Sequence, residues 1–178
     1  MTLTPWAPVF TDRPIDEQPA APAATNNGWG VYFFGFRERR RPGTRSPTVY
    51  PLRIGMTAVD GGFRQRFYDF LYGSGLQHKS FLAELEQQGL EVCYCYADVR
   101  AAVEVAAAAE PGKLPRTLVA SIETSILGAF NFAANSSKNG GYRSLILPAE
   151  VRARLAEARR LEKTIPSQKA LRTALMVE

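Results

Sequence analysis

Glu123 is the acidic residue whose sequence neighbours are most unusual for a charged side chain. Apolar residues recur at helical spacing between Arg116 and Phe130, and Glu123 is the only charged residue there after Arg116. On a helix, the positions three and four residues away from it are all apolar: Val119, Ala120, Ile126 and Leu127. A carboxylate on an apolar face is costly to bury unless it is paired or bound to a metal ion. Two interpretations of Glu123 stay open: a catalytic or metal-binding group, or the structural partner of a nearby arginine.

Three arginines and a tyrosine are further candidates, each with a simpler structural interpretation. Arg53 interrupts a short apolar stretch typical of a strand. The simpler interpretation is an arginine on an edge strand that faces solvent. Arg64 and Arg66 lie on a predicted helix, where they would clamp a phosphate group or form the solvent-exposed face. Tyr32 lies among strand aromatics and is typical of a core residue, although a buried hydroxyl needs a hydrogen-bond partner.

Other catalytic classes have little support in the sequence. His78 is the single histidine, and Cys93 and Cys95 lack the two further ligands that a zinc site requires. These cysteines are too close for good disulfide geometry, so we expect a reducing, cytoplasmic environment. The sequence contains no glycine-rich phosphate loop and no Gly-x-Ser-x-Gly motif. It also lacks the run of about 18 to 20 apolar residues that a membrane helix needs.

Charge and length favour a small domain that binds a polyanion. The 178 residues fit one compact domain, and the formal net charge is +5. Five arginines gather around one acid, Glu38, in a stretch that ends in turn-forming residues, and we expect an exposed basic loop there. The arginines of this basic loop are Arg37, Arg39, Arg40, Arg41 and Arg45.

The order of elements follows from apolar periodicity. Strands are predicted over 30–36, 52–55 and 90–97, and the first of them is apolar on both faces, as in a central strand. Helices are predicted near 63–71, 81–85, 98–110 and 116–130, and a last helix between Pro148 and Pro166. Residues 1–27 have no period and are expected to be a flexible extension, which Trp6 and Phe10 could dock onto the domain.

Three motifs in order resemble the GIY-YIG nuclease domain. Gly30-Val31-Tyr32 is similar to its first motif and Arg53-Ile54-Gly55 to its second, on successive strands. Arg66, among helical aromatics, is similar to the family's helix arginine, with Arg64 as the alternative. Glu123 is followed by apolar and aromatic residues and an asparagine at the family's spacing: Ile126, Leu127, Phe130 and Asn135. Two positions depart from the pattern, since Arg53 replaces a tyrosine and Phe132 replaces a proline.

The resemblance implies an α/β fold of the α+β type, with a small three-stranded, mainly antiparallel sheet flanked by helices. It places a nuclease domain at 28–147 and a C-terminal helical extension at 148–178. It further implies a DNA endonuclease in which Glu123 holds one Mg²⁺ or Mn²⁺ ion and Tyr32 accepts a proton from the attacking water. Arg53 would contact the scissile phosphate or lower the pKa of a nearby hydroxyl, and Arg66 would stabilise the charge that develops on the phosphate.

The expected partner is double-stranded DNA, and a restriction role would favour a homodimer. The basic loop would contact flanking phosphates; the remaining residues expected at the nucleic acid are Arg64 and Asn135. Two alternatives stay open. The chain is a nucleic-acid-binding module that has lost cleavage, or it is a small α/β interaction domain that matches the motifs by accident.

Overall fold

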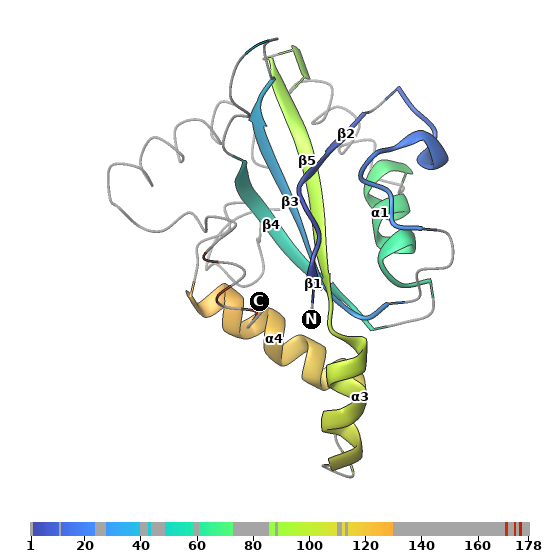
Figure 1. Ribbon diagram of the computed structural model, residues 1–178, viewed down its shortest axis with the longest axis vertical. Coiled ribbons are helices and arrows are strands. Elements are labelled where there is room, and N and C mark those ends of the chain that lie inside the picture. Colours follow the sequence, from blue (N-terminus) through green and yellow to red (C-terminus); the bar gives the residue numbers. More distant parts are fainter. Residues whose placement is uncertain are drawn as a thin grey trace.

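The protein has an α+β fold in which an antiparallel sheet packs against helices on both faces (Figure 1). A computed structural model describes residues 2–10, 12–23, 28–39, 43, 49–58, 61–72, 86–87, 89–109, 112, 114–129, 170, 173 and 175. The predicted helices near 81–85 and between Pro148 and Pro166 lie outside these residues.

Strand β3, Gly30–Glu38, is the centre of the sheet. It pairs antiparallel with β4, Tyr50–Thr57, on one side and with β5, Leu90–Asp98, on the other. Both faces of β3 are buried, because its apolar residues follow one another without polar interruption from Val31 to Phe36. The prediction of a central strand is confirmed, but the strand is the third along the chain and not the first.

The sheet is larger than the predicted three strands. Strands β1, Thr2–Leu3, and β2, Ala7–Val9, both pair antiparallel with β5, end to end along its outer edge (Figure 1). Strands of two and three residues are too short to produce an alternating pattern, so the prediction of three strands was wrong in number. Residues expected to form an extension therefore contribute β1 and β2 to the sheet.

Three α-helices and one short 3-10 helix, Ile15–Glu17, complete the described fold. Helix α1, Gly62–Tyr72, starts after Gly61, whose φ of 87° lies in the left-handed region that glycine tolerates. Helix α3, Arg100–Ala109, starts where the carboxylate of Asp98 accepts a hydrogen bond of 2.9 Å from the backbone N–H of Arg100. Helix α4, Pro115–Ala129, has proline at its first position. No helix in these described ranges is long and apolar enough to cross a membrane.

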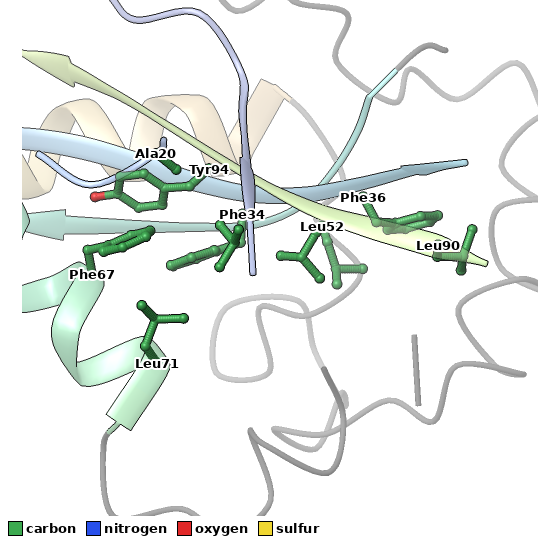
Figure 2. Packing of buried hydrophobic residues seen from close by; sticks show 10 residues of the cluster. Ala20, Phe34, Phe36, Leu52, Phe67, Leu71, Leu90 and Tyr94 are labelled. Carbon is green, nitrogen blue, oxygen red and sulfur yellow. The ribbon is translucent and has the colours of Figure 1, made fainter. Parts of the chain in front are cut away.

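Two apolar clusters lie on opposite faces of the sheet, because successive strand residues point to opposite sides. Figure 2 shows the first cluster, where Phe67 and Leu71 of α1 extend toward Phe34 and Tyr94 on the sheet. The second cluster joins Ile126 of α4 to residues of the other face: Val31, Phe33, Ile54, Cys95 and Ala97. Helices α1 and α4 therefore cover different faces.

The segment after β2 is fastened by Gln18, whose side chain is only 5% exposed. Its Oε1 accepts a hydrogen bond of 2.8 Å from the backbone N–H of Phe10. Its Nε2 donates to the carbonyl oxygens of Phe10 and of Arg13, the latter at 2.9 Å. One buried amide thus satisfies three backbone groups of this segment.

We expect Gln18→Ala to lower the free energy of unfolding by about 2 to 3 kcal/mol, because buried backbone groups lose their partners. Chemical denaturation monitored by circular dichroism measures the change. The matched control is Gln87→Ala at an exposed position, where we expect a change within about 0.5 kcal/mol. A Gln18→Ala protein as stable as this control would contradict the prediction.

Candidate functional site

Strands β3 and β4 place two of the candidate residues on one face of the sheet. Tyr32 lies opposite Gly55, and Phe34 lies opposite Arg53. Residues opposite each other in a ladder point to the same side, so Tyr32 and Arg53 share a face. In the described sheet β4 pairs with β3 alone, so β4 is an edge strand and Arg53 lies at the edge of the sheet.

The ring of Tyr32 lies directly over Gly55. A Cβ atom added to Gly55 would be only 2.4 Å from both Cζ and the hydroxyl oxygen of Tyr32. Any residue other than glycine would displace the ring, because heavy atoms do not approach so closely. Gly55 therefore lets the Tyr32 hydroxyl extend across β4.

A pocket of about 170 Å³ opens beside this ring. Three aromatic and three charged residues line it: Tyr32, Phe34, Arg53, Arg66, Asp69 and Phe70. Phe34 and Phe70 stack with ring centroids 3.5 Å apart, which joins α1 to the sheet at this point. Pockets for drug-sized molecules usually hold roughly 300 to 1,000 Å³, so this one suits a small group such as a phosphate.

Four charges act on the Tyr32 hydroxyl. Burial raises its pKa, and the positive charges of Arg53 and Arg66 partly offset this effect by lowering it. The negative charges of Glu123 and Asp69 raise the pKa further. The net direction is upward, so Tyr32 is a neutral phenol at neutral pH.

Arg66 has an incomplete set of partners. Its Nη1 lies 3.6 Å from Oδ2 of Asp69, one helical turn further along α1. Its Nε is buried and has no hydrogen-bond partner within the described part of the chain. A guanidinium group with an unused donor beside a pocket is suited to binding an oxyanion.

Glu123 approaches the site from α4. The helix buries Ile126 against the other face of the sheet and Val119 in a separate cluster with Val99 and Val103, and Glu123 between them is partly buried. It does not line the pocket, but its charge is near enough to raise the pKa of Tyr32. Of the four residues predicted to be catalytic, Tyr32, Arg53 and Arg66 thus line one pocket, and Glu123 lies within electrostatic reach.

The donor chemistry at this place fits a hard cation. Glu123 and Asp69 supply carboxylate oxygens, the ligands that Mg²⁺ and Mn²⁺ prefer. Among the described residues no three histidine, cysteine, aspartate or glutamate side chains group as a metal site would require. A Mg²⁺ ion usually keeps several waters and is bound through one or two protein carboxylates, so Glu123 is the residue that could hold it.

Two other predicted binding residues, Arg64 and Arg37, are engaged elsewhere. Arg64 donates to the carbonyl oxygen of Pro22 at 2.9 Å and forms an ion pair with Asp16, so it fastens the N-terminal segment to α1. Arg37 forms an ion pair of 2.5 Å with Glu91, its cross-strand partner. Arg39 is exposed. The predicted residues Arg40, Arg41, Arg45 and Asn135 lie outside the described part of the chain.

Asp69 lines the pocket but was not among the site residues predicted from the sequence. The residue follows Arg66 by three positions, a spacing at which helical side chains are neighbours, so the pair was visible in the sequence. What the sequence did not show is that Phe34 and Phe70 hold this pair at the pocket.

Comparison of the chain with protein-family models, with curated proteins and with solved structures finds no match.

Cys93 and Cys95 are buried thiols away from this pocket. Burial raises the pKa of Cys93 to about 12 and that of Cys95 well above its ordinary value. A thiolate is the nucleophilic form, so these residues are inert in the folded protein.

We expect neither cysteine to react with Ellman's reagent at pH 8 in the native protein. An unperturbed thiol with a pKa of about 8.5 would be partly ionised at this pH and would react within minutes. Because the raised pKa keeps both groups protonated until well above pH 8, labelling should appear only on unfolding in guanidinium. Rapid labelling of the native protein would contradict this assignment.

We expect Gly55→Ala to destabilise the protein by about 1 to 3 kcal/mol, since the added methyl group collides with the Tyr32 ring. The matched control is Gly128→Ala in α4, where nothing lies within 4 Å of an added Cβ. The control should leave stability unchanged or raise it by up to about 1 kcal/mol.

A double-mutant cycle tests whether the collision is the cause. In a Tyr32→Ala background, Gly55→Ala should cost much less than in the wild type. An equal cost in both backgrounds would mean that Gly55 is required for another reason.

Proposed function

We propose that the protein is a metal-dependent endonuclease of the GIY-YIG type that hydrolyses phosphodiester bonds in DNA. The observation that carries the proposal is the grouping of Tyr32, Arg53 and Arg66 around one phosphate-sized pocket, with the Glu123 charge in reach of the Tyr32 hydroxyl. These are the four residues that the motif resemblance selects.

Each side chain has a role that its position supports. Arg53 and Arg66 face the pocket with positive charge and can bind the non-bridging oxygens of a phosphate. Arg66 in particular keeps a buried Nε–H donor without a partner among the described residues. Such donors stabilise the charge that accumulates on phosphorus oxygens during hydrolysis.

Tyr32 acts as a neutral phenol. Its raised pKa excludes a preformed phenolate at neutral pH. The hydroxyl oxygen can still accept a hydrogen bond from the attacking water while its own proton is donated to a phosphate oxygen, so that protons balance without prior ionisation.

Glu123 is the proposed ligand of a divalent cation, Mg²⁺ or Mn²⁺. When bound, the cation would supply electrostatic stabilisation of the phosphate oxygens and a lower pKa for a coordinated water. Asp69 offers a second carboxylate near the same hydroxyl.

Flanking contacts to DNA are proposed for the exposed arginine Arg39. Arg37 has part of its charge neutralised by Glu91 and should contribute less. Contacts of this kind are independent of base sequence and weaken with salt. A homodimer and a cytoplasmic location belong to the same proposal, the first because a symmetric site needs two active centres.

We expect the protein to nick supercoiled plasmid with Mg²⁺ or Mn²⁺, and Glu123→Ala, Arg66→Ala and Tyr32→Phe to reduce the rate. Loss of a group that acts at the transition state typically costs roughly 100- to 1,000-fold. The matched control is Glu104→Ala, which removes an exposed acid on α3 and should leave nicking unchanged. Gel electrophoresis of the topoisomers measures the rates.

Two results would count against the enzyme: no nicking by the wild type with either cation, or undiminished nicking by Glu123→Ala. A protein that shifts plasmid in a mobility-shift assay but does not nick it would instead favour the non-cleaving binding module. The replacement of the motif tyrosine by Arg53 would then explain the loss of cleavage.

A further inference from the structure

Asp69 is the acidic member of the pocket lining, and its two carboxylate oxygens face different neighbours. Oδ1 accepts a hydrogen bond of 2.7 Å from Nε2 of Gln65, one turn earlier on α1. Oδ2 faces Nη1 of Arg66 at 3.6 Å. A carboxylate is thus fixed beside the guanidinium group to which a phosphate would bind.

The contact between Asp69 and Arg66 is loose. A charge-assisted hydrogen bond between such groups measures about 2.7 to 2.9 Å, well below the observed 3.6 Å. The side chains are 40% and 45% exposed, so solvent screens the pair further. Arg66 therefore keeps donors that another anion can take, while Asp69 already offers it a negative neighbour.

We propose that Asp69 is a positioning residue that competes with the substrate phosphate for Arg66 and lowers the affinity of the pocket for oxyanions. Its charge attracts the guanidinium group before an anion binds, and a phosphate must enter against that charge. The ligand class, a phosphate group, rests on the proposed function.

The size of the effect follows from Coulomb's law. Removal of one unit charge a few ångströms from a bound anion, in surroundings between protein surface and water, changes affinity roughly 3- to 10-fold. Because salt screens charges at this partly exposed site, the effect is largest at low ionic strength.

The test is an NMR titration of the full-length protein with inorganic phosphate, in a low-salt buffer that contains EDTA and no added metal. The Nε–H signals of Arg53 and Arg66 report binding at the pocket, including binding in the millimolar range. We expect Asp69→Asn to bind phosphate roughly 3- to 10-fold more tightly than wild type. Asp69→Glu, which keeps the charge, should bind it as wild type does.

The matched control is Glu104→Gln. Glu104 forms an ion pair of 2.9 Å with Arg100, four positions earlier on α3, and is similarly exposed. Its neutralisation changes net charge by the same amount but is not at the pocket, so its phosphate affinity should equal that of wild type. An equal gain in both variants would attribute the effect to net charge alone and would overturn the inference.

Three further outcomes would also overturn it: unchanged or weaker binding by Asp69→Asn, tighter binding by Asp69→Glu, and no measurable binding by any variant. Loss of structure cannot imitate the expected result, since unfolding weakens binding and the expected change is a gain. Failure of the proposed function is separate: a wild type that does not cleave DNA, together with tighter phosphate binding by Asp69→Asn, leaves an anion site without nuclease activity.

Discussion

Strand β3 has to satisfy two hydrogen-bonded neighbours and two apolar layers at once. Its backbone pairs with β4 and β5, while Val31 and Phe33 enter the cluster under α4 and Phe34 and Phe36 enter the cluster on the α1 side. A strand in this position has no side facing solvent, so a charge within it would be buried. The first charged residue, Arg37, comes near the end of the strand, where Glu91 on β5 pairs with it.

The same strand carries Tyr32, the candidate site residue whose hydroxyl is least suited to such a core. Tyr32 follows the alternation of β3 onto the α1 side, and its ring passes over Gly55 of β4. The absence of a side chain at Gly55 gives the hydroxyl a route from the buried centre of the sheet to the pocket near its edge. The contact between Tyr32 and Gly55 therefore serves two purposes. The aromatic ring packs against β4 through it, and it places the hydroxyl group at the pocket.

How far the sequence predicts this arrangement depends on the length of each element. Strands β3 and β5 and helices α1 and α4 have enough residues for their apolar period to appear, and all four were predicted. Strands β1 and β2 are too short for an apolar period to appear. They form strands because they pair with the outer edge of β5. The number of strands was therefore wrong although the class was right.

In the candidate site, too, the sequence shows the spacing of residues on a helix but not how the helix packs on the sheet. Arg64 and Arg66 are two positions apart on a helix, so they point to nearly opposite sides. From the sequence alone, each remained open as a phosphate ligand or as part of the solvent-exposed face, with Arg66 the better match to the motif. Burial of Phe63, Phe67 and Leu71 fixes how α1 is rotated against the sheet, which directs Arg64 to Asp16 and Arg66 to the pocket. Asp69 acquires its place by the same rotation.

The charged side chains around Tyr32 do not lower the pKa of its hydroxyl below the ordinary value. Two arginines lower the pKa of the hydroxyl and two carboxylates raise it, so the side-chain charges oppose one another and burial sets the direction. Neutralisation of Glu123 and Asp69 would remove two of the three effects that raise the pKa and leave both that lower it. A positively charged ligand at these carboxylates therefore acts on Tyr32 in the direction that proton transfer requires, whereas a phosphate that binds alone to the arginines acts in the opposite direction. In this arrangement the hydroxyl would be most easily deprotonated with a cation at the carboxylates and no phosphate at the arginines, and a bound phosphate would offset part of the effect of the cation.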